Sequence, residues 1–151
     1  MDNIDRKILS LLQNDASLSI SEIASQVNLS STPCWKRIRR LEDEGIIRKR
    51  VALLDSDKIG GGIMVFISIK TNEHNQDWFN QFVTTVNGMS EVMGFYRLAG
   101  DVDYLMKVVV PDIASYNDFY LRLIDRLPLS NVTAGVVMEQ IKDTTELPLP
   151  H

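Results

Sequence analysis

Apolar residues recur at helical spacing through the first 45 residues of the chain, which predicts three short helices. The first helix carries its apolar stripe on Ile4, Ile8, Leu11 and Leu12. Ser19 and Glu22 have the spacing of a capping box, in which each side chain accepts from the other residue's backbone N–H, so a second helix begins there. Its stripe consists of Ile20, Ile23, Ala24 and Val27.

The third helix has clear start and stop residues. Ser30 or Ser31 is a suitable N-cap, and Pro33 falls in the first turn, where its missing N–H costs little. Gly45 is expected just past the last turn, in the left-handed conformation that glycine adopts readily.

The pattern changes from helical to strand-like after Gly45. Strand-like apolar runs occupy residues 46–47, 51–54 and 63–69, and the glycines at 60–62 predict a hinge or domain boundary. A helix with an apolar stripe at Phe79, Phe82, Val83 and Val86 follows. Strands are then expected at 92–98 and 104–110, a helix from about residue 112 to Pro128, and a last strand at 132–141.

This order is β-α-β-β-α-β, the ferredoxin-like arrangement of two βαβ halves over one antiparallel sheet. The predicted fold class is therefore α+β. A three-helix, winged-helix-like helix-turn-helix domain with a linker strand spans 1–60, and a ferredoxin-like domain spans 61–151.

Charge is distributed unevenly between these two regions. The chain carries a net charge of −4, but residues 1–60 sum to +1 and residues 61–151 to −5. Residues 32–41 hold four basic side chains and no acid. In an acidic protein, such a local reversal of sign is typical of a surface that meets a phosphate backbone.

At about 100° per residue, the third helix has two distinct faces. Cys34, Ile38 and Leu41 share an arc that we expect to be buried, while polar and basic residues lie opposite and Trp35 lies between the two faces. A helix-turn-helix places such a face in the DNA major groove, whereas a solvated cationic helix is the alternative. The predicted DNA-binding residues are Ser31, Thr32, Trp35, Lys36, Arg37, Arg39 and Arg40.

Two further segments each allow two interpretations. Arg48, Lys49 and Arg50 follow the basic helix and fit either a wing that touches the DNA backbone or an ordinary charged edge strand. Residues 100–104, with the sequence GDVDY, fit either a binding loop whose carboxylates receive an ammonium group or metal ion, or a plain hairpin turn.

Several classes of function find no support in the sequence. One cysteine permits no internal disulfide and fits a reducing compartment, and neither a signal peptide nor a membrane span is visible, so we expect a soluble cytoplasmic protein. The two histidines, His74 and His151, form no evident catalytic pairing, and no set of residues has metal-ligand spacing. We therefore predict no enzyme activity, no metal and no cofactor. Cys34 is expected to be a small buried hydrophobe, with a helix-activated thiolate as the alternative.

Motifs in both halves of the chain resemble the leucine-responsive/asparagine regulator family, Lrp/AsnC. They are IDRKIL at 4–9, the stretch 29–40, LEDEGII at 41–47, GDVDYL at 100–105, VPD at 110–112, LP at 127–128 and VMEQIK at 137–142. This resemblance implies a transcription regulator that binds a pseudo-palindromic DNA operator and an amino-acid effector. It also implies a homodimer that assembles further, with an octamer expected, and an effector site at Gly100, Asp101, Asp103, Tyr104, Thr133, Ala134 and Gly135.

Two alternatives to a sequence-specific regulator remain open at the level of the sequence. One is an architectural protein of the same family that compacts DNA with little sequence choice. The other is a metabolic enzyme or regulatory subunit, since ferredoxin-like domains host both catalysis and ligand binding. The first 45 residues argue against the enzyme, for which they have no evident use.

Overall fold

The structure is a computed structural model that describes residues 1–56, 58–73 and 75–150. Both histidines, His74 and His151, lie outside the described residues. Contacts divide the chain into two compact units. The N-terminal unit comprises Met1–Leu53 together with the residues from Lys142 onward, and the C-terminal unit comprises Leu54–Ile141.

These units differ at both ends from the predicted division at residue 60. Residues 54–56 and 58–60 belong to the C-terminal unit, and the chain after Ile141 returns to the N-terminal unit. Leu149 packs against the N-terminal core and Leu147 is hydrogen-bonded to Gln13. A boundary placed on a glycine cluster cannot anticipate a return of the chain through such contacts.

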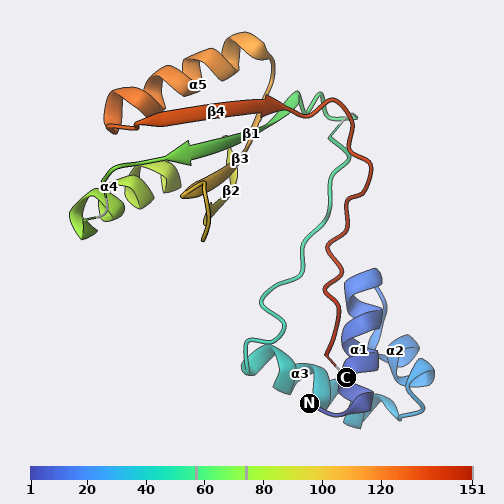
Figure 1. Cartoon of the computed structure of the whole chain (residues 1–151). Helices are drawn as coiled ribbons and strands as arrows, with labels where there is room; N and C mark the ends of the chain where they lie inside the picture. The colour runs from blue at the N-terminus through green and yellow to red at the C-terminus, as the bar shows by residue number, and fades with distance from the viewer. Residues whose placement is uncertain (57, 74, 151) are drawn as a thin grey trace. The chain divides into compact units, whose positions relative to one another are not determined.

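The N-terminal unit contains the three predicted helices, which are α1 (Asn3–Asn14), α2 (Ile20–Gln26) and α3 (Ser31–Asp43) (Figure 1). The capping box of Ser19 and Glu22 opens α2, and Ser30 is the N-cap of α3. Gly45 has a φ of +72°, as predicted for the residue after the last turn. The apolar stripes of the three helices meet in one core, whose fully or nearly fully buried residues are Ile8, Ile23, Ala24, Cys34, Ile38 and Leu41.

The C-terminal unit has the predicted β-α-β-β-α-β order. Its elements are β1 (Ile63–Lys70), α4 (Gln76–Asn87), β2 (Val92–Arg97), β3 (Tyr104–Val110), α5 (Ile113–Arg126) and β4 (Asn131–Val136). The strands form one antiparallel sheet in the order β2-β3-β1-β4, and α4 and α5 cover one of its faces (Figure 1).

Alternation along the strands decides which side chains enter the core of this unit. Val65, Ile67 and Ile69 of β1 point toward the helices and are completely buried. They pack with Phe82 of α4 and Phe119 of α5, which are also completely buried. Phe66 lies between the buried positions and therefore points away from the helices, where it is 38% exposed.

Two predicted strand segments are wrong and a third is wrong in part. Among the described residues between α3 and β1, none forms a strand, although residues 46–47 and 51–54 have strand-like sequences. The last strand ends at Val136 rather than at residue 141. Strand formation requires a hydrogen-bonded partner, and a local apolar pattern does not supply one. The linker strand of the predicted fold class is thus absent from these segments, while the rest of that class is present.

No helix in the part of the chain that the structure describes is long and apolar enough to cross a lipid bilayer.

Candidate nucleic-acid interface and effector loop

The outer face of α3 presents the polar and basic residues that its periodicity predicts. Ser31, Thr32 and Lys36 are exposed, and Trp35 is 51% exposed. The side chain of Arg39 is 59% exposed, and its contacts with Glu42, at 3.5 Å, and with Asp43, at 3.7 Å, are long. Surface ion pairs of this kind contribute little, so the Arg39 guanidinium can exchange them for phosphate or base contacts.

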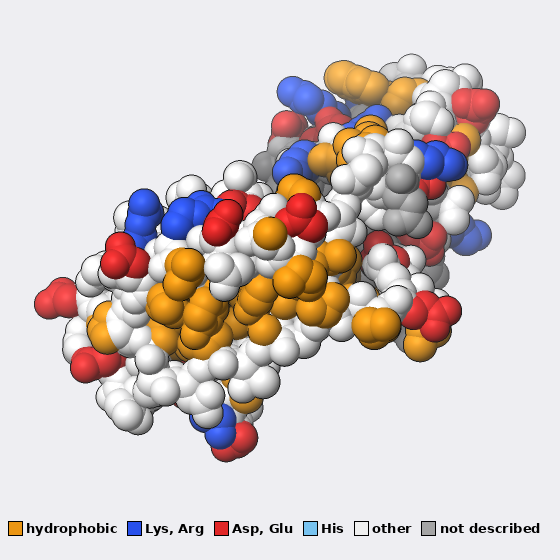
Figure 2. Space-filling model, turned by 90° about the horizontal axis from the view of Figure 1, so that it is seen from above, with side chains coloured by type: hydrophobic (Ala, Val, Ile, Leu, Met, Phe, Trp, Pro, Cys, Tyr) orange, Lys and Arg blue, Asp and Glu red, His pale blue; other side chains and the backbone are white. Residues whose placement is uncertain are grey.

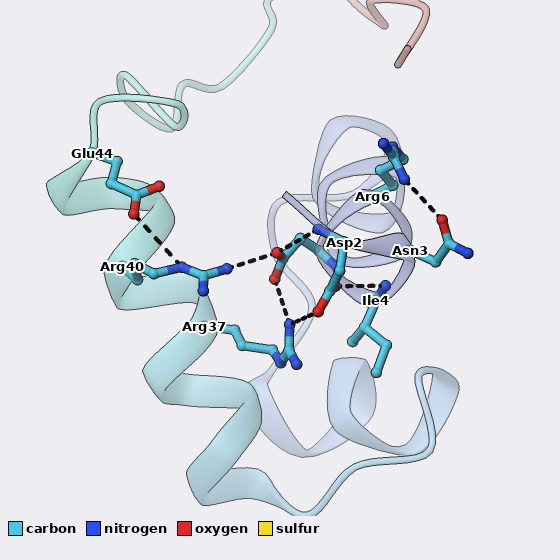
Figure 3. Close-up of polar contacts among 8 residues, drawn as sticks. Asp2, Asn3, Ile4, Arg6, Arg37, Arg40 and Glu44 are labelled. Atoms are coloured by element: carbon cyan, nitrogen blue, oxygen red, sulfur yellow. Dashed lines mark hydrogen bonds and ion pairs between the residues drawn. The ribbon is translucent and has the colours of Figure 1, made fainter. Parts of the chain in front are cut away.

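Arg37 and Arg40 are placed differently, because both reach across to the start of α1 (Figure 3). The Arg37 guanidinium donates to the carboxylates of Asp2, at 2.7 Å, and of Asp5, at 2.8 Å. Arg40 donates to the second carboxylate oxygen of Asp5 at 2.6 Å. Arg37 and Arg40 are thus predicted DNA-binding residues whose guanidinium groups are bound to carboxylates of the N-terminal unit.

The two carboxylates also cap α1, and this lowers the pKa of both. Asp2 accepts from the N–H groups of Ile4 and Asp5, while Asp5 accepts from the N–H of Asp2, which completes a capping box. The Asp5 N–H, followed by the Arg37 guanidinium, lowers the pKa of Asp2 to about 2. Burial by itself raises the pKa of Asp5, but the Asp2 N–H, Arg37 and Arg40 outweigh it and the pKa is lowered.

Sequence reasoning missed these two aspartates. The spacing of Asp2 and Asp5, directly before an apolar helical stripe, is the capping-box pattern that located α2, and it could have located this site as well. Nothing in the linear sequence indicates that two arginines more than 30 residues away share the same carboxylates.

The basic residues after α3 form no strand. Arg48, Lys49 and Arg50 are exposed in an irregular segment, and Arg50 donates to Glu42 at 3.1 Å. A wing built on a strand is therefore not present at these residues, although the positive charge next to α3 is.

Residues 98–103 form the connection between β2 and β3 at one end of the sheet. The backbone of Asp103 bonds to Leu98 and to Ile69, and one carboxylate oxygen of Asp103 accepts from the Thr71 N–H at 2.8 Å. The Asp101 carboxylate accepts from the Lys70 side chain at 2.7 Å, and 88% of the Asp101 side chain is exposed. The end of β1 therefore holds the loop in place and leaves Asp101 at the surface.

The structure brings most of the predicted effector residues to this end of the sheet. Gly100 and Asp101 are exposed and Asp103 is half-buried. Thr133 lies on β4, where it pairs with Ser68 near the end of β1 that holds the loop. Ala134 and Gly135 continue along β4 and are exposed.

Tyr104 differs from the other predicted effector residues, since alternation along β3 turns its ring into the core. Tyr104 is 5% exposed, and its ring lies 5.1 Å from that of Phe82 and 5.5 Å from that of Phe95. Its side chain packs against α4 at the start of β3.

A hollow of about 480 Å³ opens between α4 and β2, and Tyr104 is one of the residues that line it. Phe79, Val83 and Phe95 line it, together with Arg97, whose guanidinium lies 5.9 Å from the centre of the Phe79 ring. Apolar walls with one cation fit a small amphipathic anion, so this hollow is a second place where an effector could bind.

Two sequence-level interpretations concern residues with reactive or metal-binding groups. Within the described ranges, no group of three His, Cys, Asp or Glu side chains is arranged to hold a metal ion.

Cys34 is completely buried, as predicted, and burial raises the pKa of its thiol although Arg37 opposes this. The environment of Cys34 favours the neutral thiol over a reactive thiolate.

Comparison with known proteins relates both units to one family. Residues 64–147 match the family model for the Lrp/AsnC ligand binding domain, and residues 1–48 match that for a winged helix-turn-helix DNA-binding domain. The chain is 54% identical over 150 residues to the DNA-binding transcriptional activator DecR of Escherichia coli strain K12, covering 99% of each protein.

Solved structures agree with these matches. An AsnC family transcriptional regulator from Agrobacterium tumefaciens has a TM-score of 0.94 and 51% identity, over 98% of this chain and 97% of that one. A transcriptional regulator from Neisseria meningitidis, crystallised as an L-Met complex, has a TM-score of 0.92 and 32% identity, over 98% and 96% of the two chains. With an exposed basic helix in one unit and a ferredoxin-like sheet in the other, the chain belongs to the Lrp/AsnC family of DNA-binding transcriptional regulators, not to a family of enzymes.

Proposed function

We propose that this regulator reads operator DNA with the outer face of α3. Lys36 and Arg39 supply the charge, Ser31 and Thr32 supply hydrogen bonds, and Trp35 packs against a sugar or a thymine methyl group. Arg40 contributes the part of its guanidinium that is not bound to Asp5. The observation that carries this proposal is the exposure of Arg39 and Lys36 on a helix whose opposite face is buried.

The effector in this proposal is an amino acid bound at the loop of residues 100–103. Its ammonium group pairs with Asp101 or Asp103, and its carboxylate accepts from backbone N–H groups of the glycine-containing loop. Thr133, Ala134 and Gly135 complete the site along β4. The L-Met complex of the Neisseria meningitidis regulator supports this class of ligand.

Self-association is the third part of the proposal. The sheet face that α4 and α5 leave uncovered carries Phe66 and Tyr96, which alternate with core residues and are 38% and 52% exposed. Apolar side chains also gather on the side of this unit that Figure 2 shows. Two such sheet faces packed together form a homodimer, and dimers assemble to an octamer on a pseudo-palindromic operator in the cytoplasm, where the DNA is.

Footprinting on DNA selected by the protein from a random duplex library tests the regulatory function. Discrete protected sites, shifted by an added amino acid, are expected for a regulator. Uniform coverage would instead identify an architectural protein that compacts DNA, and absence of binding would refute both.

Calorimetry with each of the twenty amino acids tests the effector site. If Asp103→Ala weakens the binding seen with the wild-type protein, the result supports the loop as the effector site. Asp118→Asn, at an exposed position of α5, is the charge-matched control. Binding that survives Asp103→Ala but is lost in Arg97→Ala would place the effector in the hollow between α4 and β2.

The mass of the assembly in solution, compared between wild type and Phe66→Glu, tests the sheet interface.

A further inference from the structure

The carboxylate of Asp5 is buried between α1 and α3, with only 2% of the side chain exposed. We propose that Asp5 is a positioning residue for DNA recognition, which retains Arg37 as a lock between the two helices and fixes the orientation of Arg40. Arg37 then makes no contact with DNA, although it belongs to the basic cluster of α3. This inference rests on the proposed DNA-reading face and divides its arginines into two kinds.

Both oxygens of the Asp5 carboxylate accept hydrogen bonds. One oxygen accepts from Arg37 at 2.8 Å. The other accepts from Arg40 at 2.6 Å and from the Asp2 N–H at 3.0 Å. Asp5 thus ties the first turn of α1 to two successive turns of the recognition helix.

Arg37 is bound more firmly than an arginine in an ordinary exposed ion pair. A single Arg37 nitrogen contacts both Asp2 and Asp5, and only 27% of the side chain is exposed. If Arg37 turned toward DNA, the buried Asp5 carboxylate would keep Arg40 but lose one of its two arginine partners, and removing a partner from a buried ion pair is strongly unfavourable. Arg39, two residues further along α3, is 59% exposed, and its contacts with Glu42 and Asp43 are long, at 3.5 and 3.7 Å.

Arg40 occupies an intermediate position. One of its terminal nitrogens contacts Asp5, its Nε lies 3.8 Å from Glu44, and 48% of the side chain is exposed. A guanidinium carries five N–H donors in a fixed fork, so Arg40 can be oriented by Asp5 and still offer donors to DNA. Orientation of this kind favours specific over non-specific contacts, because a fixed guanidinium matches one base or phosphate geometry.

The first test compares Arg37→Gln with Arg39→Gln, two equal charge changes on the same helix. Each variant is titrated with a duplex selected by the wild-type protein, at several salt concentrations. For Arg39→Gln we expect a shallower salt dependence of affinity, by about 0.9 in the log–log slope for each phosphate that the variant no longer neutralises. For Arg37→Gln we expect the slope of the wild-type protein.

The two outcomes of this comparison separate the inference from the proposed function. A shallower slope in Arg37→Gln would show that Arg37 contacts phosphate and would overturn the inference, while leaving the DNA-reading face intact. An unchanged slope in Arg39→Gln would refute the proposed reading face instead.

The second test uses Asp5→Asn, in which an amide nitrogen replaces one acceptor oxygen and the remaining carbonyl oxygen is neutral, so neither arginine keeps an ion pair with residue 5. With Arg37 and Arg40 held less firmly, we expect the ratio of affinities for the selected duplex and a scrambled duplex to fall about tenfold, and the salt slope to steepen. Asp118→Asn changes the net charge equally and is expected to leave both quantities unchanged. Circular dichroism of each variant defines the temperature range in which it is folded.

Adding Arg37→Gln to Asp5→Asn completes the design. If the steeper slope comes from the released Arg37, the double variant returns toward the wild-type slope. A merely structural Asp5 would lower the thermal stability of Asp5→Asn while leaving the affinity ratio and slope of the folded protein unchanged, and that result would overturn the inference. Should Asp5→Asn fail to fold, the comparison of Arg37→Gln with Arg39→Gln still decides it.

Discussion

Gln13 of α1 and Leu147 of the C-terminal segment are joined by two hydrogen bonds. The Gln13 side-chain nitrogen donates to the Leu147 carbonyl at 3.1 Å, and the Leu147 N–H donates to the Gln13 side-chain oxygen at 2.7 Å. Asn14 adds a bond to Glu146 at 3.1 Å, and Leu149 packs on the core of the N-terminal unit. The segment that follows the ferredoxin-like unit therefore stabilises the DNA-binding unit.

Gln13→Ala is expected to lower the free energy of unfolding of the N-terminal unit by about 1 kcal/mol, since it removes two solvent-accessible hydrogen bonds. Amide hydrogen exchange of α1 measures this effect locally. Gln26→Ala, at the exposed end of α2, is the matched control. Equal exchange rates in the two variants would show that the segment does not stabilise α1 in solution.

The N-terminal unit is expected to lose stability as the pH falls from about 5 to 2. The pKa of Asp2, at about 2, and the lowered pKa of Asp5 lie below the value near 3.9 of an unfolded aspartate. Their contribution is thus present above the unfolded pKa and is lost as the pH falls through the folded pKa.

Asp15 and Glu22 of the same unit also have lowered pKa values, so some loss occurs whether or not Asp5 is present. Denaturant titrations at pH 7, 5 and 3 should therefore show a larger fall for the wild-type protein than for Asp5→Asn. Parallel curves for the two proteins would contradict a lowered pKa at Asp5.

Gly62→Ala is expected to destabilise the C-terminal unit by about 2 kcal/mol or more. Gly62 has a φ of +76°, and a Cβ atom there would lie 2.0 Å from the Val110 carbonyl oxygen, so both strain and a backbone clash result. At Gly135, by contrast, a Cβ would meet nothing within 4 Å. Thermal unfolding should show a lower transition for Gly62→Ala than for Gly135→Ala, and similar transitions would argue against close approach of these backbones.

The Cys34 thiol is expected to react slowly with an aromatic disulfide reagent in the native protein. The side chain is completely buried and its thiol pKa is raised, so neither access nor thiolate character favours reaction. The rate should rise steeply with denaturant as the N-terminal core opens. Fast reaction under native conditions would instead support a redox role for Cys34.

Local patterns predicted the helices and the paired strands well. The apolar stripes and caps located α1, α2 and α3, and the buried set of Cys34, Ile38 and Leu41 followed from angular position alone. Each of these features depends on contacts within one turn of helix or on one face of one element. The strands predicted directly after Gly45 were wrong, because strand formation depends on a partner segment that the local sequence does not specify.

Side-chain direction explains the remaining differences at the sites. Tyr104 follows Asp103 in the chain, but alternation along β3 turns its ring toward Phe82 and away from the loop. The place of Tyr104 on the strand, and not its position next to the loop motif, thus sets the direction of its ring; its role in effector binding stays a prediction.

The sequence by itself determined the family, the order of the elements and the existence of a basic helix with one buried and one exposed face. Only the tertiary structure decided how the arginines of that helix differ. Arg37 and Arg40 meet a carboxylate from α1, whereas Arg39 remains at the surface. Helical periodicity records the direction in which a side chain leaves its helix, but the charge that it meets there comes from a residue distant in the chain, and only folding brings the two together.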